Sequence, residues 1–256
     1  MKHRLLQILS GILFLGSWQG LEARTFKIAG VPEVPLKFYK ADRSMAGIDI
    51  DLVDHIFKKL GIKYKIILLH SAESLTEFYE KNLCDMVLSL SKNKSRDLYL
   101  EFASKPHLFL DWSFLVRVQD YQKFNGKKPA DLTDYRVGLT KYYSYTDEIL
   151  SLASSRKIKV LWESQNRMQV KNLVQNKVDL VLMNKMATSA YLQKKKLDQK
   201  LRFLDNYVDR KPYYHAFVRK SSYPGLNDLI KKYNRYLEEA LDSGFVDKLI
   251  NTHKNH

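Results

Sequence analysis

The sequence contains a single cysteine, Cys84, and none of the common motifs of catalytic or metal chemistry. One thiol excludes an internal disulfide. Because Cys84 directly precedes an apolar stretch at residues 85–88, we expect it to be an inert thiol in the core. His70, His107 and His215 lack the spacing of metal ligands, and no nucleophile elbow, zinc-protease or phosphate-loop motif occurs. The sequence therefore predicts no metal and no cofactor.

The chain also lacks an apolar run of the roughly 20 residues that a membrane-spanning helix needs. Its N-terminal apolar run, residues 5–15, follows the basic residues Lys2 and Arg4 and precedes the small residue Ala23. This arrangement is typical of a signal peptide. No cysteine lies near the cleavage point, so we expect no lipid anchor. We predict a signal peptide at residues 1–23 and a soluble protein exported to the periplasm, with Arg24 as its first residue.

Acidic residues are outnumbered, with 28 Asp and Glu against 43 Lys and Arg, which gives a formal net charge of +15. The lysines are scattered over the predicted helices and do not form one basic arm. Export also removes the usual nucleic-acid partners. We therefore expect no nucleic-acid binding. A basic surface of this kind is either merely solvated or attracts anionic solutes and anionic envelope surfaces.

Predicted strands and helices alternate along the chain. The first set has strands at 25–31, 64–69 and 85–90, with a helix that Asp49 is expected to cap and Gly61 to end. After a polar stretch at 119–129, a second set follows, with strands at 136–139, 157–162 and 178–183 and helices at 165–176 and 185–195. A strand at 213–219, a long helix at 226–241 and a short helical tail at 245–250 complete the chain. Such alternation implies right-handed crossovers and a mostly parallel sheet.

Residues 88–106 form the most informative polar segment. An apolar strand ends in Ser89, Ser91 and Asn93 and is followed by one arginine, Arg96. A guanidinium offers two parallel N–H donors to a carboxylate, and neighbouring hydroxyl and backbone N–H groups can fill its remaining lone pairs. The segment is therefore either a carboxylate cradle or a solvated turn whose arginine makes a surface ion pair.

Several motifs, in order along the chain, resemble those of the bacterial extracellular solute-binding proteins of family 3. Residues 47–52, Gly-Ile-Asp-Ile-Asp-Leu, are similar to that family's G-F-D-V-D-L signature. Residues 91–106 resemble its T-x-T-x-x-R…F-S-x-P segment, residues 173–181 its L-x-x-G-x-V-D-A-V strand, and residues 213–220 its Y-x-x-A-x-R-K strand. These proteins are the periplasmic components of polar amino-acid importers.

The resemblance implies an α/β, two-lobe periplasmic binding protein fold of type II, with a mostly parallel sheet flanked by helices in each lobe and a two-strand hinge. Lobe one would comprise residues 24–115 plus 212–256, and lobe two residues 119–208. A solute would be held in the cleft between them, where side chains from both lobes replace its water.

The resemblance also assigns site residues. Arg96 falls at the position of the carboxylate-binding arginine, and Ser91 and Asn93 fall at the hydroxyl positions before it, next to Ser89. The second-lobe loop, usually G-S/T-T, is Tyr142-Tyr143-Ser144, whose serine is expected to cap the next helix. The aromatic shelf Y-P-P-F becomes residues 33–36, which leaves Phe38 or Tyr39 as substitutes.

One departure from the family's motifs changes the charge of the predicted site. The aspartate that usually holds the ligand ammonium is Asn184, and a neutral amide cannot balance a cation as a carboxylate does. Either the solute is not a standard α-amino acid, or Glu33, Glu73 or Asp111 supplies the missing charge.

The leading hypothesis is a monomeric binding protein that captures a small carboxylate-bearing solute and delivers it to an ABC permease in the inner membrane. The alternatives are a dehydratase-like enzyme on the same fold, with Glu33 or His107 as the acid, and a ligand-sensing module.

Overall fold

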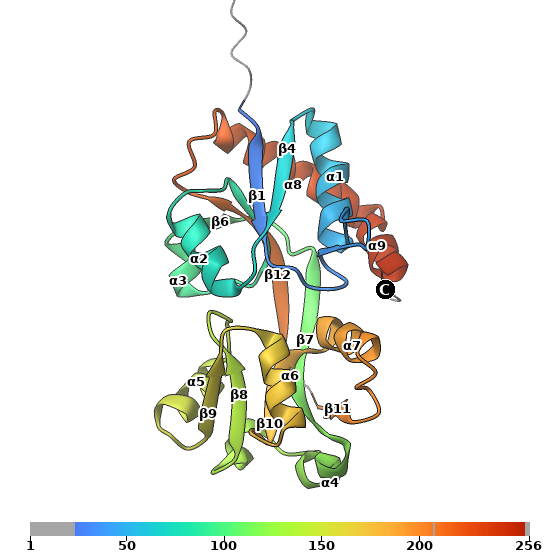
Figure 1. Ribbon diagram of the computed structural model, residues 1–256. Coiled ribbons are helices and arrows are strands. Elements are labelled where there is room, and N and C mark those ends of the chain that lie inside the picture. The colour runs from blue at the N-terminus through green and yellow to red at the C-terminus, as the bar shows by residue number, and fades with distance from the viewer. Residues whose placement is uncertain (1–23, 207, 254–256) are drawn as a thin grey trace, which may run out of the picture.

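Two α/β lobes lie end to end and share two long strands (Figure 1). The structure is a computed structural model that describes residues 24–206 and 208–253. The predicted signal peptide lies outside these residues. Among the described residues, no helix is both long enough and apolar enough to cross a membrane.

The sheet of the first lobe is built around β1 (Phe26–Gly30), which pairs in parallel with β4 (Tyr64–Leu68) and β5 (Met86–Leu90). A short strand, β6 (Leu100–Phe102), and a small hairpin of β2 (Phe38–Tyr39) and β3 (Met45–Ala46) complete its strands. Its helices are α1 (Ile48–Leu60), α2 (Ala72–Glu80), α3 (Lys94–Asp97), α8 (Leu226–Asp242) and α9 (Phe245–His253).

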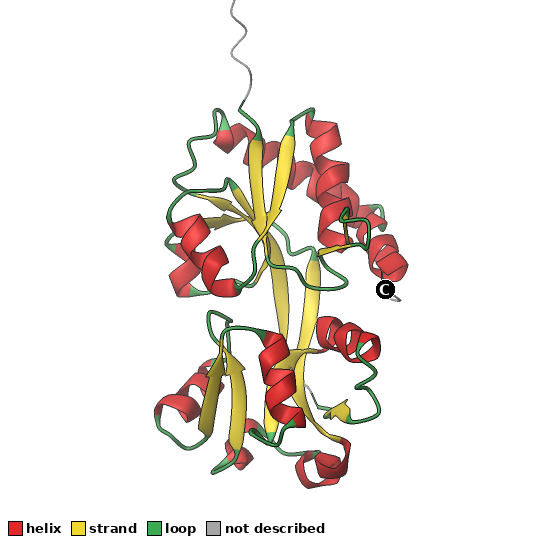
Figure 2. Ribbon diagram, in the orientation of Figure 1, coloured by secondary structure: helices red, strands yellow, loops and turns green. Residues whose placement is uncertain are grey.

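The sheet of the second lobe is centred on β8 (Arg136–Thr140), which pairs in parallel with β9 (Lys159–Glu163) and β10 (Leu180–Asn184). The other elements of this lobe are β11 (Leu201–Phe203), α4 (Tyr121–Phe124), α5 (Asp147–Ser154), α6 (Asn166–Val174) and α7 (Lys185–Lys194). Two short 3₁₀ turns, at Val118–Asp120 and Pro129–Leu132, lead into it. In both lobes the strands lie between helices (Figure 2).

The two lobes are joined by β7 (Leu108–Arg117) and β12 (Asp209–Val218), which pair antiparallel over residues 108–112 and 209–213. Beyond that shared section, β7 continues along β10 and β11, whereas β12 continues along β5 and β6. One continuous sheet thus runs through both lobes. The predicted two-lobe α/β fold is confirmed.

Helix α1 shows how local sequence positions the first lobe's interior. Gly47 precedes the helix with φ +125°, and a Cβ atom there would lie 2.4 Å from the carbonyl oxygen of Leu36, so only glycine fits. Gly61 ends the helix in the left-handed conformation, as predicted. The prediction that Asp49 caps the helix is wrong. Asp49 lies inside the first turn, after the N-cap residue Gly47, and is fully buried. Its carboxylate bonds to side chains of the core and not to the N–H groups at the helix start.

Candidate ligand-binding site

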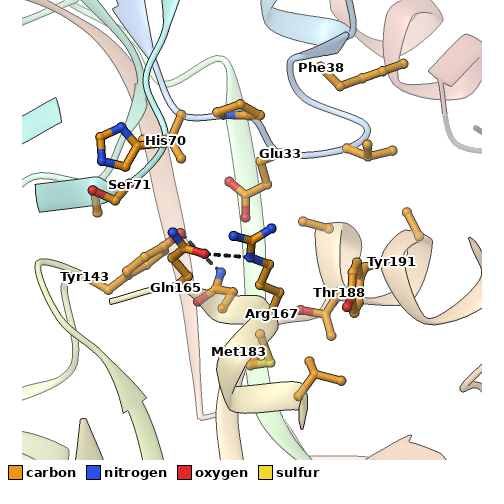
Figure 3. Close-up of a pocket in the computed structure, with 18 of the residues that line it drawn as sticks. Glu33, Phe38, His70, Ser71, Tyr143, Gln165, Arg167, Met183, Thr188 and Tyr191 are labelled. Carbon is orange, nitrogen blue, oxygen red and sulfur yellow. Dashed lines mark hydrogen bonds between the residues drawn. The ribbon is translucent and has the colours of Figure 1, made fainter. Parts of the chain in front are cut away.

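Two adjoining cavities lie between the lobes. The larger has a volume of about 450 Å³ and is here called the outer chamber (Figure 3). In the first lobe it is lined by residues 31–34, 38 and 70–72. In the second lobe it is lined by residues 143, 164–167, 170 and 183 and by one face of α7. The smaller, of about 40 Å³, is called the inner pocket; it is lined by Lys37, residues 88–91, Arg96, residues 142–144 and Tyr213. The two share Val31, Glu33, Ala72 and Tyr143. Both cavities therefore belong to one interlobe cleft.

Arg96 lines the inner pocket and is 8% exposed. Asn93 begins the short helix α3, and its side chain accepts a hydrogen bond from the Arg96 backbone N–H at 2.8 Å. The Arg96 guanidinium donates to the carbonyl and hydroxyl oxygens of Ser91, at 2.8 and 3.2 Å, and to the carbonyl of Tyr142 in the other lobe at 3.0 Å. Among the described residues, no ion pair includes Arg96. Burial lowers its pKa, and the pocket holds a cation whose hydrogen-bond acceptors are all neutral.

The loop from Tyr142 to Ser144 closes the cleft from the second lobe. Tyr142 has a φ of +64°, and besides accepting from Arg96 it donates its phenol to Glu73 at 3.0 Å, again across the cleft. Tyr143 lines both cavities, and burial raises the pKa of its phenol. The prediction that Ser144 caps the next helix is wrong, since Thr146 caps α5. Ser144 instead accepts a hydrogen bond from Lys211 through its carbonyl oxygen.

Asn184 and Glu33 form another contact between the lobes. The Asn184 side chain caps α7 by accepting from the Ala187 N–H at 3.1 Å, and its amide donates to the Glu33 carboxylate at 3.0 Å. Desolvation raises the pKa of Glu33, while nearby Lys37 opposes the rise. Of the three acids proposed to replace the missing aspartate, only Glu33 lines the cavities. Glu73 bonds Tyr142, and Asp111 pairs with Arg210 at 3.8 Å.

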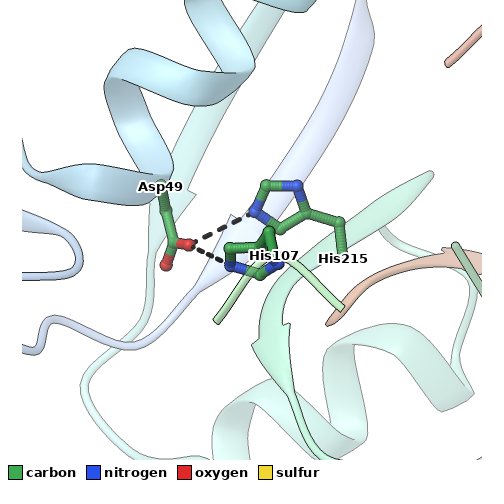
Figure 4. Close-up of side chains that lie close together, drawn as sticks. All are labelled: Asp49, His107 and His215. Carbon is green, nitrogen blue, oxygen red and sulfur yellow. Dashed lines mark hydrogen bonds and ion pairs between the residues drawn. The ribbon is translucent and has the colours of Figure 1, made fainter. Parts of the chain in front are cut away.

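Behind the inner pocket lies a fully buried polar cluster around Asp49, here called the Asp49 cluster (Figure 4). The Asp49 carboxylate accepts from Lys37 at 3.0 Å, from Ser89 at 2.7 Å, from His107 at 2.9 Å and from His215 at 3.3 Å. Burial raises the pKa of Asp49, but the Lys37 ammonium and the two histidine bonds outweigh it and hold that pKa well below its usual range. Burial lowers the pKa of His215 to about 4. The Ser89 hydroxyl thus bonds Asp49 even though Ser89 lines the inner pocket.

The sequence did not indicate the Asp49 cluster, because its members are far apart in the chain. His107 directly precedes β7 and His215 lies within the first-lobe part of β12, and their ring nitrogens come within 4.8 Å of each other and of an Asp49 oxygen. Three such groups are enough ligands for a metal ion. The ammonium of Lys37, however, already neutralises the carboxylate. We therefore interpret the cluster as a buried ion pair with two histidine donors.

The remaining predicted residues take different positions. Phe38 lines the outer chamber, whereas Tyr39 is 49% exposed and does not. Sequence reasoning missed Arg167, Thr188, Tyr191 and Lys194, which line the chamber from the second lobe. A signal was available, since residues 164–167 follow the carboxyl end of the parallel strand β9, and ligands of α/β folds bind at such ends.

The sequence profile of the bacterial extracellular solute-binding proteins, family 3, matches residues 27–256. No curated protein matches the chain by sequence.

Three examples illustrate the solved structures that share the fold. AbpA, an amino acid ABC transporter substrate-binding protein from Streptococcus pneumoniae bound to L-arginine, has a TM-score of 0.74 at 18% identity, covering 90% of this chain and 94% of that one. The GluR0 ligand-binding core in complex with L-glutamate has a TM-score of 0.75 at 16% identity, with 91% and 99% covered. The ancestral amino acid-binding protein AncCDT-1, a precursor of cyclohexadienyl dehydratase, has a TM-score of 0.71 at 19% identity, with 90% and 94% covered.

Proposed function

Since the chain belongs to the bacterial extracellular solute-binding proteins of family 3, we propose that it captures an amino acid or a related carboxylate-bearing solute in the interlobe cleft. The protein would act in the periplasm. The signal peptide predicted at residues 1–23 would export the chain, and the loaded protein would deliver its solute to an ABC permease in the inner membrane. The protein itself would act as a monomer.

The observation that carries this proposal is the unpaired charge of Arg96. A buried guanidinium bonded only to carbonyl and hydroxyl oxygens has lost its water without gaining a counter-ion. A solute carboxylate would supply that counter-ion through two parallel N–H···O bonds. The hydroxyl of Ser91 lies within reach of the same guanidinium and would add a donor to the carboxylate. Asn93 would act indirectly, by fixing the first turn of α3.

Glu33 is our candidate for the ligand ammonium. It lines both cavities, and its Asn184 partner is neutral, so its charge faces the cleft. An ammonium beside Glu33 would favour the ionised carboxylate and offset the desolvation that raises its pKa. Asn184 would then orient Glu33 and cap α7 without contributing charge of its own.

Ligand entry requires the lobes to separate. Among residues 24–206 and 208–253, hydrogen bonds cross the cleft from Arg96 to the Tyr142 carbonyl, from Tyr142 to Glu73, and from Asn184 to Glu33. Rotation about the two shared strands β7 and β12 would break all three and expose the inner pocket. We propose that closure around the solute replaces the Arg96–Tyr142 bond by an Arg96–carboxylate pair.

The test is a calorimetric comparison of amino acids with their methyl esters and with the corresponding amines, using protein that begins at Arg24. Amino acids with a free carboxylate should bind, and each ester or amine should lose at least tenfold in affinity. Equal binding of an amino acid and its ester would overturn the role assigned to the Arg96 pocket.

A second candidate function, a dehydratase-like enzyme, is favoured by one observation. Glu33 lines the cleft and desolvation raises its pKa, a shift toward the protonated form that a general acid requires. Nuclear magnetic resonance of solute recovered after long incubation separates the two functions. Unchanged solute supports binding alone, whereas loss of water from the solute would support catalysis.

A further inference from the structure

The outer chamber has mostly apolar walls. Side chains from both lobes contribute to them, including Val34, Phe38, Val170, Met183, Ala190 and Tyr191. A volume of about 450 Å³ is in the range of cavities that enclose a small organic molecule. A ligand group that fills it must tolerate the loss of water on most of its surface.

The outer chamber is lined by more basic than acidic side chains. Of the described residues that line it, Glu33 is the one acid, while Arg167 and Lys194 are basic. Figure 3 shows the Glu33 carboxyl and the Arg167 guanidinium entering from opposite walls. Arg167 donates to the Gln165 side chain at 2.6 Å, and among the described residues neither basic group is part of an ion pair. Once a ligand ammonium occupies Glu33, no second carboxylate remains for another cation.

The inner pocket is too small for a whole amino acid. Its volume of about 40 Å³ is far below the roughly 450 Å³ of the outer chamber. It can therefore admit one carboxylate beside Arg96. With the ammonium at Glu33, which borders both cavities, the side chain of the ligand must extend into the outer chamber.

We propose that the ligand is an α-amino acid with an aromatic side chain, and that the chamber discriminates against arginine. This inference rests on the proposed carboxylate site at Arg96. Aromatic rings suit the apolar walls, and the rings of Phe38 and Tyr191, the sulfur of Met183 and the guanidinium of Arg167 are all favourable ring contacts. An arginine side chain would instead meet Arg167 and Lys194 with no acid to pair with.

The experiment is calorimetry on the protein from Arg24 with L-phenylalanine, L-tyrosine, L-tryptophan, L-arginine and L-glutamate. At least one aromatic amino acid should bind at least tenfold more tightly than L-arginine, and L-glutamate tests whether Arg167 and Lys194 instead select an acidic side chain. Ala190→Trp, which fills the chamber from α7, should weaken aromatic binding at least tenfold. Ser189→Trp on the same helix, at a position that does not line the chamber, is the matched control and should bind like the wild type. Circular dichroism verifies that both variants are folded.

The outcomes are distinguishable. Tight L-arginine or L-glutamate binding with weak aromatic binding overturns this inference and leaves the proposed function intact. Aromatic binding that Ala190→Trp does not weaken, in a folded variant, overturns the placement of the side chain in the chamber. Failure of the folded wild-type protein to bind any of the five overturns the amino-acid form of the proposed function and this inference with it.

Discussion

The Asp49 cluster and the interlobe cleft both bury charged side chains, but they differ in how those charges are balanced. In the Asp49 cluster, the carboxylate receives a lysine ammonium, a hydroxyl and two imidazole groups. In the cleft, Arg96 meets only neutral oxygens, and Glu33 meets a neutral amide. The Lys37 ammonium neutralises the Asp49 carboxylate within the protein. In the described part of the cleft, Arg96 and Glu33 have no such counter-ion, and the carboxylate and ammonium of an amino acid could pair with them. Burial alone therefore does not distinguish a structural charge from a functional one.

The largest expected effect is a loss of folding stability when the Asp49 cluster is broken. Asp49→Ala would leave the Lys37 ammonium buried without its partner, and removing one member of a buried pair costs about 3–5 kcal/mol. Urea unfolding should show this loss. Glu77→Gln, which breaks the exposed Glu77–Lys81 pair, is the control and should cost less than about 1 kcal/mol. Equal stabilities for the two variants would show that Asp49 is not the anchor of the first lobe.

A second expected effect is that the folding stability depends on pH through His215. Its pKa is lowered from 6.5 to about 4 in the folded protein, so the unfolded chain binds more protons between these values. Stability should therefore decrease as pH falls from 6.5 toward 4, by at most about 1.4 kcal/mol per pH unit. Unfolding measured across this range should show a smaller slope for His215→Gln. An identical slope in the variant would contradict the assignment.

A smaller effect, of opposite sign, is expected at Glu33. Its pKa is raised above the ordinary 4.5, so the folded state retains the proton longer, and stability should decrease as pH rises through the folded value. Glu33→Gln should remove that dependence and raise the stability of the ligand-free protein at pH 7, because the amide carries no charge to desolvate. The same variant should bind amino acids more weakly. Tighter binding by Glu33→Gln would exclude Glu33 as the ammonium site.

The sequence predicted the fold well because the fold depends on local periodicity and on motifs in a fixed order. The strands at Phe26–Gly30, Tyr64–Leu68 and Met86–Leu90 lie within a residue of their predicted bounds. Short elements with little apolar pattern were missed, among them β11 (Leu201–Phe203) and the β2–β3 hairpin.

The site was predicted less completely because its contacts join distant segments. Ser89 meets Asp49 across 40 positions, and His215 meets it across 166. The acceptor that Arg96 finds in the second lobe is a backbone carbonyl, that of Tyr142, which no side-chain pattern identifies. The hydroxyl of Ser89 looked available in the sequence, yet it is bonded to a carboxylate of the core.

The most direct test of the central claim is Arg96→Ala, measured by ligand calorimetry and by urea unfolding. If Arg96 pairs with a solute carboxylate in a desolvated pocket, affinity should fall by about 2–5 kcal/mol, or roughly 30- to 4,000-fold. The stability of the ligand-free protein should stay within about 1 kcal/mol of the wild type, because the variant loses hydrogen bonds but also an unpaired buried charge. Wild-type affinity for a carboxylated solute in Arg96→Ala, especially together with a large loss of stability, would make Arg96 a structural residue and contradict the account.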